Sequence, residues 1–238
     1  MIVENNFIKY CTHIRGVKNS TAKHYCDSIN TISRELSNLG IYDVDHLYEI
    51  DSLERLLEIK DLLANNKEFT ELNKKGHQMY SAGLNRYLEF AKGEDITSEK
   101  VLSLIDTPVD IKPQMIINER IGAKRDRIIV NQVMHAEGYL CEIDIHHKTF
   151  VAKSTNRPYM EAHHLIPLSL QYNVNKSLDV YANLVVLCPT CHRLLHFATN
   201  DEKKGSLIQL FDERQDRLND SGIKMQRSEF FELLELRM

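Results

Sequence analysis

Histidines that could hold a metal ion gather in one stretch of the chain, between Tyr159 and His196. His163 and His164 are adjacent, so on a strand one side chain would face a metal and the other a reacting water. His192 lies four residues before His196, so on a helix the two share one face and can bind the same ion. Three imidazoles with an open coordination position are typical of a hydrolytic metal centre. The spacing therefore predicts metal-dependent hydrolysis.

This stretch resembles the HNH, or ββα-metal, endonuclease family. The resemblance is carried by the string EAHHLIPLS, which begins at Glu161, by Asn183 within ANLVVLCPTCH, and by the closing His-x-x-x-His pair. Order and spacing match throughout residues 159–196. The resemblance implies that Asn183 ties a loop and orients the catalytic base, and that Glu161 supports or orients the site.

The same resemblance implies the roles of the four histidines. His163, His192 and His196 would be the metal ligands, and His164 would be the general base that takes a proton from the attacking water. Histidine suits this task because it titrates near neutrality. The metal of such a centre offsets charge that develops on the phosphate and on the leaving 3′ oxygen. Three imidazoles favour zinc, nickel or manganese, whereas family members with carboxylate or Asn ligands favour magnesium.

A second, structural zinc is also expected from the resemblance, because many family members hold one with two Cys-x-x-Cys pairs. Cys188 and Cys191 supply one pair, but the other is broken, since Asp144 stands three residues after Cys141. His147 could replace the missing cysteine and complete a closed tetrahedral site. The alternative is that Cys141 is a buried thiol without a metal. The odd number of cysteines, five, argues against a disulfide framework.

Four basic residues near the motif could contact DNA phosphates. They are Lys124, Arg125, Arg127 and Arg193. For the first three, the alternative is a solvated helix face, which basic residues beside Asp126 occupy routinely. The sequence leaves both interpretations open.

The elements that must position these residues follow from hydrophobic periodicity and turn signals. We expect a helix at Asn118–Gly138, a strand at Tyr139–Ile145, a turn at Asn156–Pro158 and a second strand at Tyr159–Ala162. A further helix should begin at about Pro189, and two helices should lie within Ile208–Met238. Proline suits the first position of a helix because its missing N–H would have no partner there.

Residues 1–92 are expected to form a helical domain without strands. Three helices are predicted, at Thr21–Asn38 with Ser20 as N-cap, at Leu53–Leu63 with Asp51 as N-cap, and at Met79–Phe90 with Gly93 at the end. This domain would recognise DNA, a partner protein or a second copy of the chain.

Glycine, prolines and several acids predict a linker at residues 93–113, with a short helix near Ser98–Leu104. Residues 114–238 would then be the HNH nuclease domain, with its core at 139–197. The expected fold class is α+β and mostly helical, with an N-terminal helical domain, a C-terminal ββα-metal domain and extra helices.

Composition limits the classes of function. The chain has 238 residues, 27% of them charged, and a formal net charge of −4, which argues against a protein that coats nucleic acid non-specifically. The first residues lack the pattern of a signal peptide, and no apolar run is long enough to span a bilayer. We therefore expect a cytoplasmic protein without a membrane partner.

Together these observations predict a metal-dependent endonuclease that hydrolyses DNA in bacterial restriction or phage defence. One alternative is a catalytically silent, zinc-stabilised DNA-binding module. Another is a subunit of a larger defence complex, in which the helical domain binds a partner. Cutting both strands usually takes two active sites, so a homodimer is a further open expectation.

Overall fold

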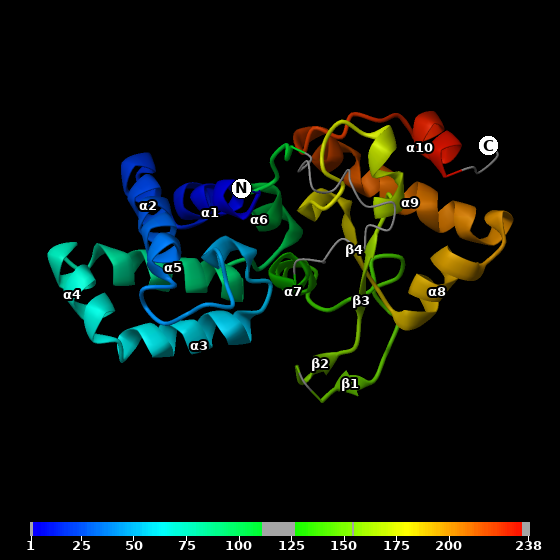
Figure 1. The fold of residues 1–238 in the computed structure, drawn as a ribbon. Helices are drawn as coiled ribbons and strands as arrows, with labels where there is room; N and C mark the ends of the chain where they lie inside the picture. Colours follow the sequence, from blue (N-terminus) through cyan, green and yellow to red (C-terminus); the bar gives the residue numbers. More distant parts are fainter. Residues whose placement is uncertain (1, 111–126, 154, 235–238) are drawn as a thin grey trace. The chain divides into compact units, whose positions relative to one another are not determined.

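The computed structural model describes residues 2–110, 127–153 and 155–234. Contacts along the chain divide it into two compact units (Figure 1). The first unit comprises Met1–Asp95 and Asp126–Gln132, and the second comprises Ile96–Arg125 and Val133–Met238. Each unit is built around its own buried residues and is described by itself.

The described residues of the first unit form helices joined by turns and loops, without a strand. Its elements are α1 (Ile2–Lys9), a π-helical turn (Tyr10–Ile14), α2 (Asn19–Glu35), a 3₁₀ turn (Leu47–Glu49), α3 (Leu53–Ala64), α4 (Lys67–Lys75), α5 (Met79–Lys92) and the start of α7 (Arg127–Ala136). The predicted helices correspond to α2, α3 and α5, and Gly93 ends α5 in the left-handed conformation as expected. The helices α1 and α4 were not predicted.

Two helix starts differ from the prediction. The N-cap of α2 is Lys18, so Ser20 lies inside the helix instead of capping it. The N-cap of α3 is Ser52, whose hydroxyl accepts a hydrogen bond from the backbone N–H of Arg55, and not the neighbouring Asp51. Both corrections are small, because several adjacent polar residues could cap each helix and tertiary packing selects among them.

The core of the first unit contains a cluster of aromatic rings from α1, α5 and the two short helical turns. Helices α2 and α5 are the two in closest contact. The rings of Phe7 and Tyr87 meet edge to face with centroids 5.3 Å apart, and Phe90 lies 5.6 Å from Phe7. Gly83 allows α5 to approach α2, because a Cβ there would lie 2.7 Å from the Cβ of Ser28. The predicted apolar faces of these helices therefore pack against each other.

The described residues of the second unit form helices and two small antiparallel sheets, which confirms the mostly helical α+β class. Its elements are α6 (Glu99–Ser103), the end of α7, β1 (Val151–Ala152), β2 (Arg157–Pro158), β3 (Glu161–His164), 3₁₀ turns at Leu168–Asn173 and Tyr181–Asn183, β4 (Leu184–Leu187), α8 (Pro189–Phe197), α9 (Asn200–Asp220) and α10 (Arg227–Leu233). Strand β3 pairs with β4, and β1 pairs with β2 in a separate hairpin.

The strand expected at Tyr139–Ile145 is wrong, because this segment forms turns and a loop. Gly138 and Tyr139 both have positive φ, which turns the chain sharply after α7. The loop is held to β4 instead: the backbone N–H of Glu142 donates to the carbonyl of Val186 over 2.9 Å. The strand expected at Tyr159–Ala162 is found two residues later, as β3.

Part of the segment expected as a linker packs inside the second unit. Its short helix, predicted near Ser98–Leu104, is α6, and the side chains of Ile96, Leu102 and Ile105 are fully buried. The predicted linker and the predicted helix from Asn118 also cover residues 111–126, which lie outside the described residues. Among the described helices, none is long and apolar enough to cross a membrane.

Two buried arginines of α9 connect α6, the end of α7 and the loop before β1. Arg214, with its side chain 1% exposed, contacts the carboxylates of Glu99, Glu137 and Glu142. Arg217 makes a two-pronged contact with the buried Asp106, at 2.6 and 3.2 Å. Since buried charges must be paired to be tolerated, these contacts specify how the elements of the second unit fit together.

Candidate active site

The unit's ββα arrangement follows from its sequence. All four residues of β4 are buried and apolar, and β3 covers one edge of it in the register His163 opposite Val185. After β4, Cys188 caps α8 by accepting a hydrogen bond from the backbone N–H of Cys191, and Pro189 takes the first helical position as predicted. Helix α8 packs on both strands, so it carries its histidines to the face of β3.

The structure brings together His163 from β3 with His192 and His196 from α8. One ring nitrogen from each lies within 4.8 Å of the others, and the Nε2 atoms of His192 and His196 are 3.3 Å apart. The ligand nitrogens of a tetrahedral zinc centre, with bonds of about 2.0–2.1 Å, are separated by roughly 3.3 Å. Both the donor atoms and their spacing therefore fit a divalent transition metal.

Glu161 supports this cluster from the start of β3. Its Oε2 atom lies 2.5 Å from Nδ1 of His192, and its Oε1 atom accepts a hydrogen bond from the hydroxyl of Tyr159 over 3.1 Å. The bond with Glu161 also raises the pKa of Tyr159. A carboxylate at Nδ1 holds that proton in place and leaves Nε2 as the nitrogen that can bind a metal. The resemblance had implied a supporting role for Glu161 without naming His192 as its partner.

His164 leaves β3 on the other face and is 7% exposed. Its Nε2 atom lies 3.0 Å from Oδ1 of Asp179, whose side chain is also largely buried. No residue in the described ranges pairs with the Nδ1 atom. Sequence analysis missed Asp179, which stands fifteen residues away in a loop where no periodicity marks it.

Asn183 is fully buried and ties together the loop between β3 and β4. Its side-chain amide donates to the carbonyls of Ile166 and Leu178, over 2.9 and 2.8 Å, and its Oδ1 accepts from the backbone N–H of Ile166. Its own carbonyl accepts from the N–H of Leu165. Asn183 therefore holds the chain directly after His164 and directly before Asp179, whose side chains form the buried pair.

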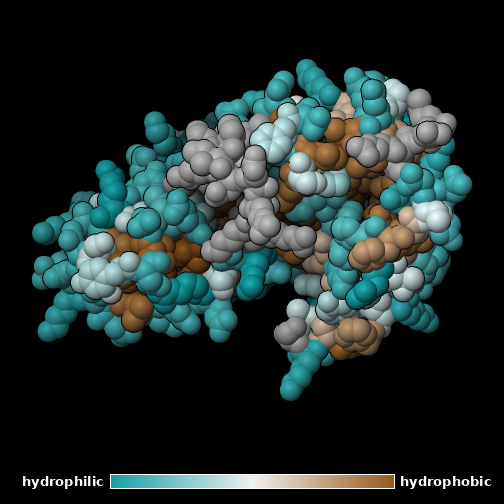
Figure 2. All heavy atoms as spheres, turned by 45° about the vertical axis from the view of Figure 1, so that its right-hand side comes forward, coloured by the Kyte–Doolittle hydropathy of each residue, from teal (hydrophilic) through white to brown (hydrophobic). Residues whose placement is uncertain are grey.

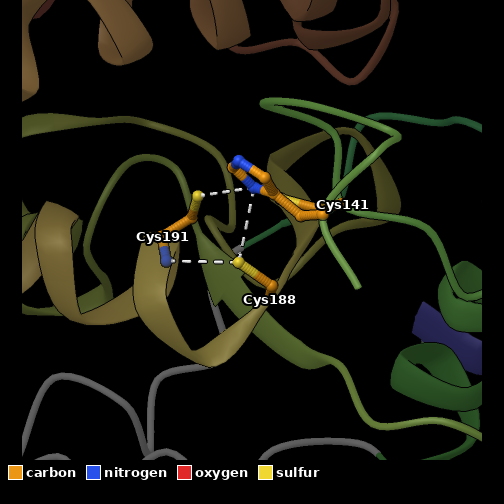
Figure 3. A group of neighbouring side chains, drawn as sticks. Cys141, Cys188 and Cys191 are labelled. Carbon is orange, nitrogen blue, oxygen red and sulfur yellow. Dashed lines mark hydrogen bonds between the residues drawn. The ribbon is translucent and has the colours of Figure 1, made fainter. Parts of the chain in front are cut away.

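A second cluster consists of Cys141, His147, Cys188 and Cys191, whose ligand atoms all lie within 4.8 Å of one another. Figure 3 shows the sulfur atoms of Cys188 and Cys191 converging on a ring nitrogen. Nδ1 of His147 is 3.6 Å from Sγ of Cys188 and 3.3 Å from Sγ of Cys191. A tetrahedral zinc with bonds of about 2.1–2.3 Å separates its ligands by roughly 3.6 Å, so this group can bind a metal ion.

Local bonds affect two residues of this second cluster, Cys141 and His147. Burial opposes ionisation of Cys141, but hydrogen bonds from the backbone of Cys188 and Asp144 lower the pKa of the thiol to about 7. Asp144, which stands where a second cysteine would be, turns the loop: it accepts the N–H of His146 at its side chain and that of His147 at its carbonyl. This turn places the ring of His147 where the missing cysteine would be needed.

The structure describes two of the four predicted DNA contacts, Arg127 and Arg193. Lys124 and Arg125 lie outside the described residues. Arg127 is exposed at the start of α7, in the first unit. Arg193 is exposed on α8, directly after His192 of the histidine cluster.

Comparison with known proteins identifies the same region. Residues 140–197 match the family model described as HNH endonuclease. The type IV methyl-directed restriction enzyme EcoKMcrA of Escherichia coli (strain K12) is 36% identical over 76 residues. That match covers 32% of this chain and 25% of the relative, so the chain spans about a quarter of its length. No solved structure gives a significant match.

Proposed function

Because residues 140–197 match the family model described as HNH endonuclease, we propose that this protein is a metal-dependent endonuclease that hydrolyses DNA phosphodiester bonds in bacterial restriction or phage defence. The observation that carries the proposal is the buried pair of His164 and Asp179 on one face of β3, with three convergent histidines on the other side of the same motif. A purely structural metal site would not need that pair.

His164 acts as the general base in this proposal. Asp179 accepts the proton of Nε2, which fixes the ring and leaves Nδ1 unprotonated and able to take a proton from water. Asn183 holds the loop that carries Asp179. Asp179 also favours the imidazolium that forms when the proton is taken up. Hydrolysis would leave a 5′ phosphate and a 3′ hydroxyl, as the family resemblance implies.

His163, His192 and His196 would hold the catalytic metal, with Glu161 orienting His192. When bound there, a divalent ion supplies positive charge to a phosphate oxygen and to the leaving 3′ oxygen. An all-nitrogen donor set favours zinc, nickel or manganese over magnesium. In the second cluster, three thiolates and one imidazole favour a structural zinc.

Plasmid cleavage tests the proposal. Purified protein with manganese, nickel, zinc or magnesium should nick plasmid DNA, and His164→Ala should lower the rate by about 100-fold or more, since a general base contributes that much. His24→Ala, which changes an exposed histidine of α2, serves as the control. Both methylated and unmethylated plasmids should be used, because the E. coli relative is methyl-directed. Undiminished cleavage by His164→Ala would remove His164 from the role of base.

The role of the first unit belongs to the same proposal. We assign residues 1–92 to recognition of DNA or to assembly with a partner or a second copy, and residues 114–238 to cleavage. Light scattering of the protein with and without DNA measures whether two copies assemble. A chain that remains a single copy on DNA and nicks one strand only would exclude the homodimer.

A further inference from the structure

The β1–β2 hairpin carries apolar side chains that the second unit leaves exposed. Phe150 is 66% exposed and Val151 is 61% exposed, and Figure 2 shows apolar surface at the projecting end where the hairpin lies. The ring of Phe150 stacks on that of Tyr159, with centroids 4.9 Å apart and planes 14° from parallel. One face of the Phe150 ring is therefore backed by a second ring, and its exposure leaves further aromatic surface open to solvent.

A continuous series of contacts connects this ring to the histidine cluster. Phe150 stacks on Tyr159, the hydroxyl of Tyr159 donates to Glu161, and Glu161 holds His192. On α8, Phe197 is 81% exposed and packs against His196, with ring centroids 5.9 Å apart. Each α8 histidine of the candidate metal centre is therefore connected to an exposed aromatic ring: His196 directly to Phe197, and His192 to Phe150 through Glu161 and Tyr159.

The hairpin is also basic. Residues 145–160 include Lys148, Lys153 and Arg157 and no Asp or Glu, in a chain whose net charge is −4. All three basic side chains belong to exposed residues, and none forms an ion pair with any residue in the described ranges. Arg157 lies over the ring of Tyr139, 5.9 Å from its centroid. Unpaired cations interleaved with exposed aromatic rings are what phosphates and unstacked bases bind.

We propose that the β1–β2 hairpin is a DNA-contacting element, in which Phe150 stacks on an unpaired base beside the scissile phosphate and Lys148, Lys153 and Arg157 bind the flanking phosphates. This inference rests on the proposed nuclease function. It adds a substrate class: DNA that is single-stranded or locally opened at the cleavage position. Stacking tolerates any base, so the hairpin selects an opened strand and not a sequence.

Binding of fluorescein-labelled DNA tests the inference without cleavage. All variants are made in the His164→Ala background with zinc present, and anisotropy is measured on single-stranded DNA, on a matched duplex and on a duplex with an internal mismatch bubble. Phe150→Ala should weaken binding of the single-stranded and bubble DNA by about 5- to 100-fold, the effect typical of losing one stacked base. It should affect the matched duplex less.

Three further variants separate the contributions. Phe150→Trp should retain binding, whereas Phe150→Leu, which keeps apolar surface without a stacking face, should not. Tyr172→Ala removes an aromatic ring of similar exposure, 63%, and should bind like the parent. Replacing Lys148, Lys153 and Arg157 together with Ala should reduce the slope of log affinity against log salt by about 2, at roughly 0.7 per phosphate contact on single strands.

A spectroscopic signal reports stacking directly. Single-stranded DNA with 2-aminopurine should change in fluorescence on binding, and Phe150→Ala should abolish the change.

The inference would be overturned if Phe150→Ala bound all three DNAs as tightly as the parent does. It would also be overturned if the variant's DNA binding were unchanged and the hairpin bound a protein instead. Plasmid cleavage by the chain with intact His164 is scored separately. If Phe150 stacks on DNA but the chain does not cleave it, only the proposed nuclease function fails. If the chain cleaves DNA but Phe150 does not stack, only the proposed role of Phe150 fails.

Discussion

At the scale of single residues, two carboxylates control the proposed chemistry through pairings that spacing does not reveal. Glu161 binds Nδ1 of His192, and Asp179 binds Nε2 of His164. Each carboxylate selects which ring nitrogen carries the proton, and therefore which nitrogen can bind a metal or accept a proton. The histidines define the kind of chemistry, and these two acids determine which of their atoms can perform it.

Asp179→Asn should be as damaging as Asp179→Ala. An amide at this position can donate to Nε2 of His164, which moves the ring proton to Nδ1, the nitrogen that must accept one. We expect kcat for DNA cleavage to fall by about 100-fold or more, with KM and bound metal unchanged. Asp110→Asn, which alters an exposed acid, is the control. A normal kcat in Asp179→Asn would mean that the pair does not orient the base.

At the scale of elements, one helix start serves both candidate metal centres. Cys188 caps α8 and belongs to the Cys/His cluster, and His192 and His196 follow on the same helix. A metal held by Cys141, His147, Cys188 and Cys191 would therefore fix the position of α8 and, with it, both histidines. Such a metal would stabilise a unit whose sheets, within the part of the chain that the structure describes, have two strands each.

Elemental analysis of the purified chain should find two transition-metal ions per molecule. His192→Ala should retain one, and Cys191→Ser should reduce both occupancies, because α8 loses its anchor. Strong chelation should lower the melting temperature of the parent and of His192→Ala alike. A single ion that disappears in His192→Ala would show that the Cys/His cluster binds none.

Contact between α2 and α5 depends on the absence of a side chain at Gly83. Gly83→Ala would place a Cβ 2.7 Å from Ser28, so we expect the free energy of unfolding to fall by about 1–3 kcal/mol. Gly205→Ala on α9 meets no atom within 4 Å and should raise it by about 0.5–1 kcal/mol through helix propensity. Urea denaturation followed by circular dichroism measures both. If Gly83→Ala were as stable as the parent, the close contact of α5 with α2 at this position would not limit the size of the side chain.

At the scale of the whole molecule, each unit has its own core. In the second unit, buried ion pairs specify how the elements pack together. Arg214 and Arg217 bring α9 together with α6, the end of α7 and the loop of Cys141. Residues that are far apart in the sequence thereby become one support for the HNH domain. The segment before that domain, with Glu99 and Asp106, is part of the support.

Arg214→Ala should destabilise the chain by about 3–5 kcal/mol, because it leaves the largely buried carboxylates of Glu137 and Glu142 without their partner. Arg227→Ala breaks a partly exposed pair with Asp212 and should cost about 1 kcal/mol or less. Thermal unfolding of both variants provides the comparison. Equal, small effects would show that the Arg214 cluster contributes no more than a surface ion pair.

Local features could be predicted from the sequence alone, because they depend on short-range geometry. The four-residue spacing of His192 and His196, the helix that begins at Pro189 and the end of α5 at Gly93 all follow from helix periodicity and backbone preferences. So does the mostly helical class of the fold, which apolar residues at helical spacing indicate.

The tertiary structure decided what those rules cannot reach. Tyr139–Ile145 has the composition of a strand, but it forms a loop because Glu142 bonds β4 and Cys141 joins the second cluster. Asp179 meets His164 only because Asn183 folds the intervening loop back, and Glu161 meets His192 only because α8 packs on β3. These contacts join distant segments, and their energy depends on burial and pairing that exist only after the chain has folded.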